Sequence, residues 1–206
     1  MKKIVALFTV AVALIAAGSA KAQISLHVGY MPETITDDIT NVGSNDVSLN
    51  GFFVGGTYNA NIAGDLNLAL GLQARYNMKS ESKTLAGIET KSNLSQLTLD
   101  VPILFNYGID LGSSLKLSAF VGPSVSFALL GQSKISIAGN ENTTNWYENN
   151  DDLSRLNLYG TVGIALTLNG QYRFFLGYNM GLLDLDKSDN CERKTNGLFL
   201  GLGMGI

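Results

Sequence analysis

Residues 66–79 read LNLALGLQARYNMK, and this stretch decides the fold. Every second side chain from Leu66 to Met78 is apolar, whereas the side chains between them are polar or small. Because side chains alternate across a β-strand, a strand here has one fully apolar face and one polar face. The stretch is also about as long as a tilted strand that crosses a bilayer, which needs roughly 9–11 residues.

The same alternation recurs in seven further segments. Each pattern is weak alone, and eight in one chain predict an antiparallel barrel that crosses a membrane with its strands. The segments are 24–31, 49–60, 66–79, 96–109, 115–130, 155–168, 171–182 and 197–206. The predicted fold is all-β, an eight-stranded antiparallel up-and-down transmembrane β-barrel.

Short and long connections alternate along the chain. Residues 61–65, 110–114 and 169–170 contain the Gly, Asn and Asp of tight turns. The other connections, 32–48, 80–95, 131–154 and 183–196, are longer and polar. Outer-membrane barrels have short periplasmic turns and long extracellular loops, and an even strand count places both termini in the periplasm. We therefore expect the four long loops outside the cell.

Alternation alone does not say which face points inward, and a soluble lipocalin-like barrel is the alternative. The apolar face contains no charged residue, and its aromatic side chains gather near the strand ends, as at a bilayer surface. The other face mixes ten glycines with bulky aromatic residues, which suits a narrow barrel interior. The aromatic residues of the apolar face are Tyr58, Tyr107 and Tyr172 near one end of the strands and Tyr30, Tyr76, Phe127 and Tyr178 near the other.

The first 22 residues have the features of an export signal. Lys2 and Lys3 precede an apolar stretch, and Ala20-Lys21-Ala22 matches the small-x-small cleavage rule. We predict a signal peptide over 1–22 and one barrel domain over 23–206. That signal contains three of the 14 basic residues and none of the 17 acidic ones, so the mature chain has a formal net charge of −6. This balance argues against a nucleic-acid partner.

Cys191 is the single cysteine, so the chain has no internal disulfide, and we expect this residue in a solvated loop. Pro102 and Pro123 fall within predicted strands. Because proline removes a backbone donor from the hydrogen-bond ladder, we expect local bulges at both.

Several stretches resemble a known family. They are the export signal followed by Gln23, the stretches 99–104 (LDVPIL) and 119–123 (AFVGP), and the glycine-rich last segment. The chain resembles small outer-membrane β-barrel domain proteins of Gram-negative bacteria, including the PorT-like group. The resemblance implies eight strands, assembly by the outer-membrane insertion machinery and an integral outer-membrane location. The chain ends in Ile206, whereas such barrels often end in an aromatic residue that the machinery reads.

An eight-stranded barrel is just wide enough for side chains to fill it. The strand parity places Arg75, Asp100, Lys116, Arg155 and Arg173 inside, and we expect them to form a polar interior core. Basic side chains outnumber Asp100 there, so their partners are open, and folded-back loop carboxylates are one source. A narrow gated channel is the alternative reading of this interior.

His27 is the only histidine and has inward parity in the first strand. Barrel enzymes that modify lipids use a histidine with a serine and a carboxylate, because the imidazole takes the hydroxyl proton. Ser124, Ser126 and Asp100 share the interior parity, but their spacing identifies no triad. We expect no enzymatic activity and no catalytic residue, with a lipid hydrolase or acyltransferase as the alternative.

The long loops are the expected working surface. They contain 14 of the 17 acidic residues, Glu33 among them, which divalent cations can bridge to lipopolysaccharide phosphates. Trp146 and Tyr147 are the one bulky aromatic pair in a polar loop, which makes them candidate binding residues or an interfacial anchor. We expect no cofactor and no specific metal site. The predicted function is a structural or surface-interaction role, with membrane lipid, lipopolysaccharide and an extracellular protein or glycan as partners.

Overall fold

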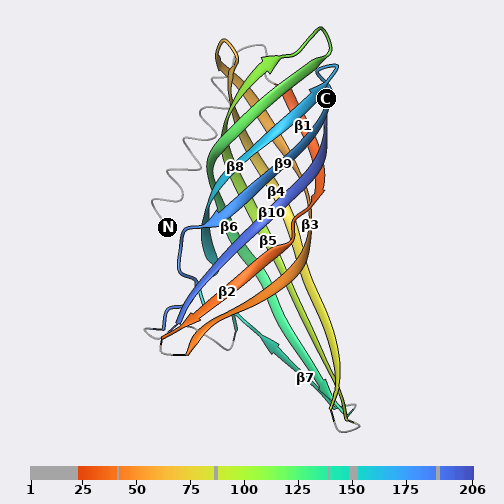
Figure 1. Ribbon diagram of the computed structural model, residues 1–206, viewed down its shortest axis with the longest axis vertical. Coiled ribbons are helices and arrows are strands. Elements are labelled where there is room, and N and C mark those ends of the chain that lie inside the picture. The colour runs from red at the N-terminus through yellow and green to blue at the C-terminus, as the bar shows by residue number, and fades with distance from the viewer. Residues whose placement is uncertain (1–22, 41, 86–87, 139, 149–152, 189–190) are drawn as a thin grey trace.

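The chain forms a closed antiparallel β-barrel (Figure 1). The computed structural model describes residues 23–40, 42–85, 88–138, 140–148, 153–188 and 191–206. The strands of this part are β1 (Gln23–Tyr30), β2 (Glu33–Ile39), β3 (Gly43–Ala63), β4 (Leu66–Leu85), β5 (Ile88–Asp110), β6 (Leu115–Ile137), β7 (Asn140–Asn145), β8 (Leu156–Leu168), β9 (Tyr172–Gly181) and β10 (Cys191–Gly205). The predicted signal peptide lies outside the described residues, and its cleavage stays a prediction.

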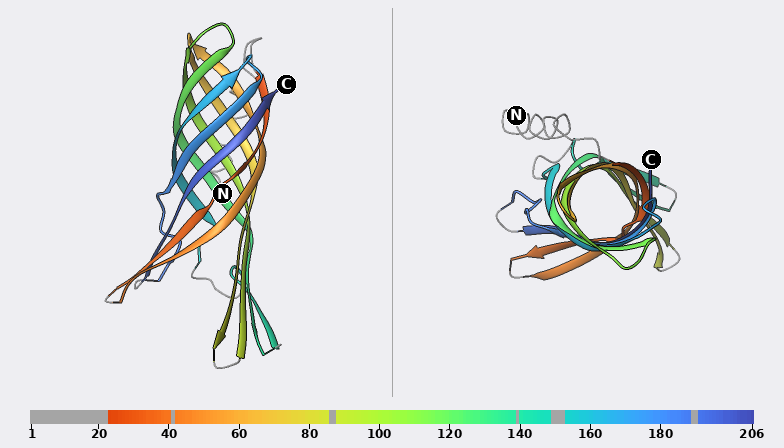
Figure 2. Two further views of the ribbon diagram at one scale, coloured as in Figure 1. Left: turned by 45° about the vertical axis from the view of Figure 1, so that its right-hand side comes forward. Right: turned by 90° about the horizontal axis from the view of Figure 1, so that it is seen from above.

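Eight of these strands close the ring, in the order β1-β3-β4-β5-β6-β8-β9-β10, and β10 pairs with β1 (Figure 2). β2 continues β1 beyond Met31 and Pro32, because both elements pair with β3 on one side and β10 on the other. β7 pairs with β6 alone among the described strands. The structure thus confirms the predicted eight-stranded antiparallel barrel.

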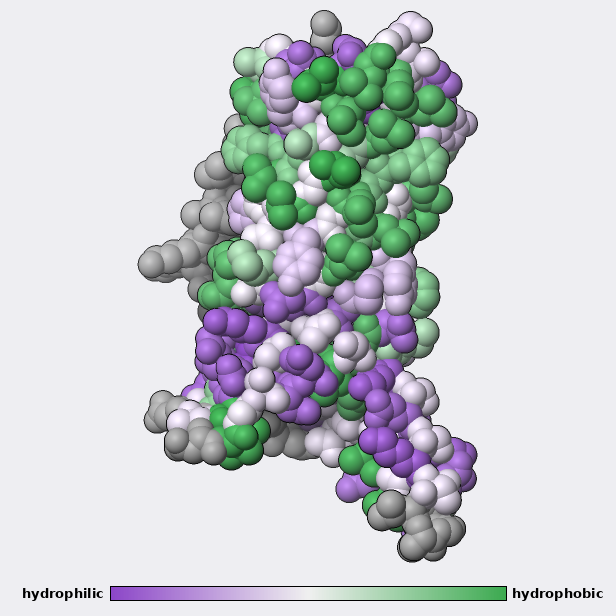
Figure 3. Space-filling model, in the orientation of Figure 1, coloured by the Kyte–Doolittle hydropathy of each residue, from purple (hydrophilic) through white to green (hydrophobic). Residues whose placement is uncertain are grey.

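The outer face of the barrel is apolar. Exposed apolar side chains follow every second position, for example from Tyr172 to Met180 on β9. Figure 3 shows this apolar surface over the barrel wall and a polar zone near the end with the long connections. We call that end the loop end. The opposite end, with the short connections and the C-terminus, is the turn end (Figure 1).

The strands continue well past the predicted loop boundaries. β4 and β5 remain paired up to Leu85 and Ile88, and β6 continues to Ile137. Much of 32–48, 80–95 and 131–154 is therefore strand, and the connections themselves are shorter than the ranges that we predicted. The alternation of apolar and polar residues ends where the strands leave the lipid, because only a lipid-facing surface requires apolar side chains. Beyond it, polar cross-strand pairs such as Ser80–Asn93 accompany the backbone ladder.

Neither proline produces the predicted bulge. The register is the same on both sides of Pro102, since Leu70 pairs with Ile103 and Gln73 with Asp100. A glycine lies opposite each proline, and at Pro102 the glycine leaves room for the ring. Pro123 pairs with Gly160, and a Cβ on Gly71 would lie 2.6 Å from Cγ of Pro102.

Four phenylalanine rings fill the middle of the barrel. They are Phe53, Phe120, Phe175 and Phe199, with neighbouring centroids about 6.2 Å apart. Each ring lies over a glycine on the adjacent strand, in the cross-strand pairs Phe53–Gly29, Phe120–Gly163, Phe175–Gly201 and Phe199–Gly177. The alternation of small and large interior residues therefore has a specific geometric purpose.

Gly163 and Gly160, three residues apart on β8, test this packing. A Cβ on the inward Gly163 would lie 2.3 Å from Cζ of Phe120 and 2.5 Å from the Leu176 carbonyl oxygen. Since a backbone atom must shift, we expect Gly163→Ala to lower the free energy of unfolding by about 1–3 kcal/mol. For the outward Gly160 the nearest atom is 3.8 Å away, so Gly160→Ala leaves stability unchanged. Urea unfolding in detergent micelles measures both, and equal losses contradict the packing argument.

Candidate functional site

A buried polar cluster occupies the barrel interior on the loop side of the phenylalanine rings. Arg75 of β4 is 1% exposed and donates to both carboxylate oxygens of Asp100 on β5, at 3.0 and 3.2 Å. Its Nη1 also donates to Glu33 of β2 at 2.5 Å. One cation therefore connects two carboxylates from different strands. Breaking such a buried pair leaves an uncompensated charge.

Glu33 is satisfied on every side. Its Oε1 accepts from the Tyr159 hydroxyl at 2.6 Å, and its Oε2 accepts from Asn77 as well as from Arg75. Tyr159 in turn lies 2.9 Å from the Thr195 hydroxyl. Side chains of β4 and β8 thus meet at the carboxylate of Glu33 on β2, and Tyr159 connects this carboxylate to Thr195 of β10.

Placing Glu33 among the solvated loop acids was wrong, because it is 2% exposed in this cluster. Its parity was readable, since 27, 29, 31 and 33 all face inward, but the predicted strand ended at Met31, before Pro32. For the same reason, the sequence analysis counted too few interior carboxylates, because Glu33 lies in the interior beside Asp100.

The other predicted core residues lie at the two ends of the barrel. Lys116 is at the turn-end rim, 3.1 Å from Asp65 and 3.8 Å from Asp110. Arg155 precedes β8 at the loop end and stacks on the Tyr147 ring, 4.9 Å from its centroid. Arg173 enters the interior from β9 near the turn end. The five predicted residues therefore do not form one cluster, and only Arg75 and Asp100 touch.

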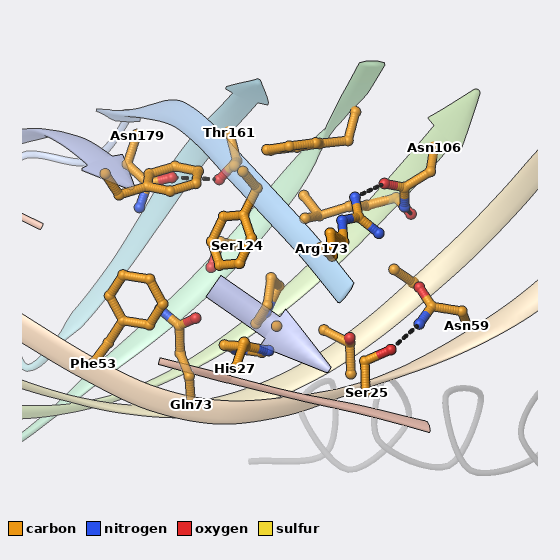
Figure 4. Close-up of a pocket in the computed structure, with 18 of the residues that line it drawn as sticks. Ser25, His27, Phe53, Asn59, Gln73, Asn106, Ser124, Thr161, Arg173 and Asn179 are labelled. Carbon is orange, nitrogen blue, oxygen red and sulfur yellow. Dashed lines mark hydrogen bonds between the residues drawn. The ribbon is translucent and has the colours of Figure 1, made fainter. Parts of the chain in front are cut away.

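Arg173 lines a cavity of about 80 Å³ on the turn side of the cluster (Figure 4). Its Nη2 donates to Asn106 at 2.8 Å, and its guanidinium lies 5.8 Å from the centre of the Phe120 ring. Sequence reasoning found Arg173 but not the cavity, since a void depends on side-chain sizes across several strands.

His27 lines the same cavity, and so does Ser124, one of the two serines that parity placed with it. Its ring is edge-on to Phe53 and Phe175, each with centroids 6.0 Å away. Ser126 accepts a hydrogen bond from Arg75 instead, at 3.3 Å. Of the residues considered for a triad, His27 and Ser124 therefore line this cavity, whereas Ser126 and Asp100 contact Arg75.

Trp146 and Tyr147 pack against the sheet. The backbone N–H of Trp146 donates to the Gly131 carbonyl, and Gln96 donates to the Tyr147 hydroxyl at 2.8 Å. Both rings pack closely over Gly131, because a Cβ on this residue would lie 2.7 Å from the nearest ring carbon of each. A binding role for this pair stays a prediction, and the contacts show how it is held at the loop end.

Comparison with known proteins agrees with this architecture. The family model described as the outer membrane protein beta-barrel domain matches residues 16–187. The chain belongs to this family. It is accordingly an integral outer-membrane protein whose apolar wall faces lipid. No curated protein sequence matches the chain significantly.

Three solved structures of similar shape have sequences that are only distantly similar to this chain. Ail of Yersinia pestis, solved with the heparin analogue sucrose octasulfate, is 14% identical with a TM-score of 0.49, covering 90% of this chain and 99% of Ail. Neisserial surface protein A is 13% identical with a TM-score of 0.46, covering 88% and 97%. OprG of Pseudomonas aeruginosa is 12% identical with a TM-score of 0.43, covering 92% and 98%. These similarities carry no information on function.

The Arg75 cluster should contribute strongly to the stability of the barrel. We expect Arg75→Leu to lower the free energy of unfolding by about 3–5 kcal/mol, because Glu33 and Asp100 lose their buried cation. Lys134→Leu removes an exposed pair with Glu141 at 3.2 Å and should cost about 1 kcal/mol or less. Urea titration in micelles compares the two, and equal losses would show that the cluster contributes no more than a surface pair.

Cys191 is on β10, paired with Ile39, and not in the loop that we expected. It is partly buried. Burial raises the pKa of its thiol, and the neighbouring Asp186 carboxylate raises this pKa further. The thiolate, which is the reactive form, is therefore scarce at neutral pH.

We expect alkylation of Cys191 by iodoacetamide to be slow at pH 7.5 and to accelerate only in alkaline solution. Asp186→Asn removes the negative charge, which lowers the thiol pKa and speeds alkylation several-fold at the same pH. Glu148→Gln, a charge change elsewhere at the loop end, serves as the control. Mass spectrometry over a pH series gives the rates, and an unchanged profile in Asp186→Asn contradicts the assignment.

Proposed function

We propose that this barrel is a non-enzymatic surface-interaction protein that binds an extended polypeptide at its loop end. The observation that supports it best is a sheet that projects beyond the lipid-facing wall. Residues 79–97 of β4 and β5 and 130–145 of β6 and β7 form this sheet, which we call the projecting sheet (Figure 1). The orientation of outer-membrane barrels places it outside the cell.

The projecting sheet has open edges. β4 pairs with β3 only as far as Met78, opposite Asn50, and from there to Leu85 its described partner is β5 alone. The β2–β3 hairpin diverges to the other side, as both side views show (Figures 1 and 2). An open edge presents backbone donors and acceptors, which an added strand can bind. The β4 edge from Lys79 to Leu85 is therefore the proposed docking strand.

The side chains of the projecting sheet also support a binding site, because its two faces differ. The outer face of the projecting sheet is polar and internally paired, as in Ser82–Glu89 and Lys134–Glu141. The opposite face exposes Ile135 and Ile137. An added strand would thus find backbone groups along the edge and apolar contacts on one side only, which fixes its orientation.

Two alternatives receive less support from the geometry. A lipid-modifying enzyme needs its catalytic groups beside lipid, whereas His27 is in the interior between phenylalanine rings. A channel needs a path, whereas Phe53, Phe120, Arg75 and Glu33 are all buried in the lumen. The proposal therefore expects His27→Ala to leave lipid A and phospholipid profiles unchanged, and planar bilayers to show no single-channel currents.

Strand addition can be tested with peptides. The purified barrel in nanodiscs is panned against a displayed library of random 12-residue peptides, and enriched peptides are measured by biolayer interferometry. We expect micromolar binding that falls at least tenfold when the β4–β5 hairpin is shortened by replacing 81–92 with Asn-Gly. This change keeps the Ser80–Asn93 pair. Shortening the β2–β3 hairpin between Thr36 and Asp46 is the matched control and should leave binding unchanged.

Backbone chemistry distinguishes strand addition from side-chain docking. Peptides methylated on alternate backbone nitrogens in one phase lose their donors to the β4 edge, and those methylated in the other phase keep them. We expect one phase to abolish binding. No enrichment, equal loss with both shortened hairpins, or indifference to methylation would each overturn the proposal.

A further inference from the structure

We propose that the barrel interior contains a binding site for a short-chain monocarboxylate, open toward the turn end. The site is the 80 Å³ cavity lined by Arg173, Asn106, Asn59, His27 and the phenylalanine rings (Figure 4). It lies far along the barrel from the projecting sheet and does not depend on the proposed surface function.

Arg173 is the cation of this cavity. Among the described residues no carboxylate lies within ion-pair distance of it. Asp100 and Glu33, the buried carboxylates of the interior, both contact Arg75, and Asp65 and Asp110 contact Lys116. Asn106 takes one of the five guanidinium N–H groups. The remaining donors leave a planar fork for which a carboxylate is the matching acceptor.

Much of the cavity wall is apolar, and the polar side chains of Gln73, Ser124, Thr161 and Asn179 line it as well. Phe53, Phe120, Phe175 and Phe199 line it together with Leu104. Small-ligand sites in proteins combine such apolar walls with few polar groups that fix orientation. The lining therefore suits a ligand with one anionic end and an apolar body, and suits a fully hydrated inorganic anion less well.

The volume limits the size of the ligand. One water needs roughly 10–15 Å³ of such space, so 80 Å³ holds about five to eight atoms of that size. Butyrate, with six non-hydrogen atoms, is a probe on this scale. Ser25, Asn59 and Arg173 are partly exposed at the turn end, which gives the route of entry.

The route does not continue to the other side. Met31 and Phe53 are 1% and 5% exposed at the inner end of the cavity, and the Arg75 cluster lies beyond them. A ligand therefore enters and leaves by the same end. The geometry points to binding, and the turn end faces the periplasm in the orientation of this family.

Met31 provides a direct readout. Of the five methionines, Met31 lines the cavity, whereas Met78, Met180 and Met204 are exposed on the lipid-facing wall and Met1 lies outside the described residues. With ¹³C-methyl-labelled methionine in nanodiscs, we expect butyrate to shift the Met31 methyl resonance saturably and leave the wall methionines unmoved. Met31→Leu assigns the resonance.

Two matched ligands and three variants test the chemistry. Butyramide has the same shape without the charge, and inorganic phosphate has the charge without the apolar body. We expect both to bind at least tenfold more weakly than butyrate. Arg173→Gln should weaken butyrate at least tenfold, Arg173→Lys less so, and the rim variant Lys116→Gln not at all. Heat-modifiable gel migration verifies that each variant is folded, and Arg173→Lys replaces Arg173→Gln if the latter does not fold.

Binding of butyramide equal to that of butyrate removes the role of Arg173 and overturns the inference. Phosphate binding as tight as butyrate overturns the carboxylate assignment in favour of a general anion site. An unshifted Met31 methyl at 50 mM butyrate overturns the site itself. None of these outcomes touches the peptide experiments at the loop end, so the two proposals fail separately.

Discussion

The structure depends on one constraint, which is that lipid offers no hydrogen bonds to the backbone. Every strand that crosses the hydrocarbon must therefore have a partner on both sides, and the pairing of β1 with β10 provides the last one. The constraint ends where water begins. On β4, Met78 is the last residue with neighbours on both sides and is also the last apolar residue of the wall; Lys79 follows with β5 alone. Open edges occur only where water can satisfy them.

Closure creates a second constraint, since eight strands leave a lumen of fixed, narrow width. The chain fills it by two different means. In the middle, each phenylalanine lies over a glycine of the next strand, so the large side chain occupies the space that the small one leaves. On the loop side, Arg75 joins Glu33 and Asp100, and Tyr159 and Asn77 also donate hydrogen bonds to Glu33. Apolar packing needs no partner atoms of a particular kind, whereas the charged cluster needs all of its members.

This difference explains what the sequence could predict. Lipid acts on every second residue in the same way, so the alternation from Leu66 to Met78 was sufficient to place the wall, the eight strands and the inward parity of Arg75 and Asp100. The contacts in the lumen join residues that are far apart in the sequence, so alternation along one strand does not predict them. Glu33 was missed because Pro32 interrupts the pattern, although β2 continues the pairing of β1 with both neighbours. The bulge expected at Pro102 is absent because Gly71 on the neighbouring strand leaves room for the ring, and the register is also continuous at Pro123.

The projecting sheet also follows from the barrel. Four short strands in water with few apolar side chains would have little stability of their own. Here β4, β5 and β6 enter the sheet directly from the wall, so their order and register are already fixed before the first exposed pair forms. The one register shift between β5 and β6, at Leu97 and Thr98, lies at this junction, where a bulge increases local twist and turns the strands. The rigid wall thus determines the direction of the sheet, and polar residues suffice beyond it. A surface of this kind can change its side chains without loss of the fold, which is what a binding edge requires.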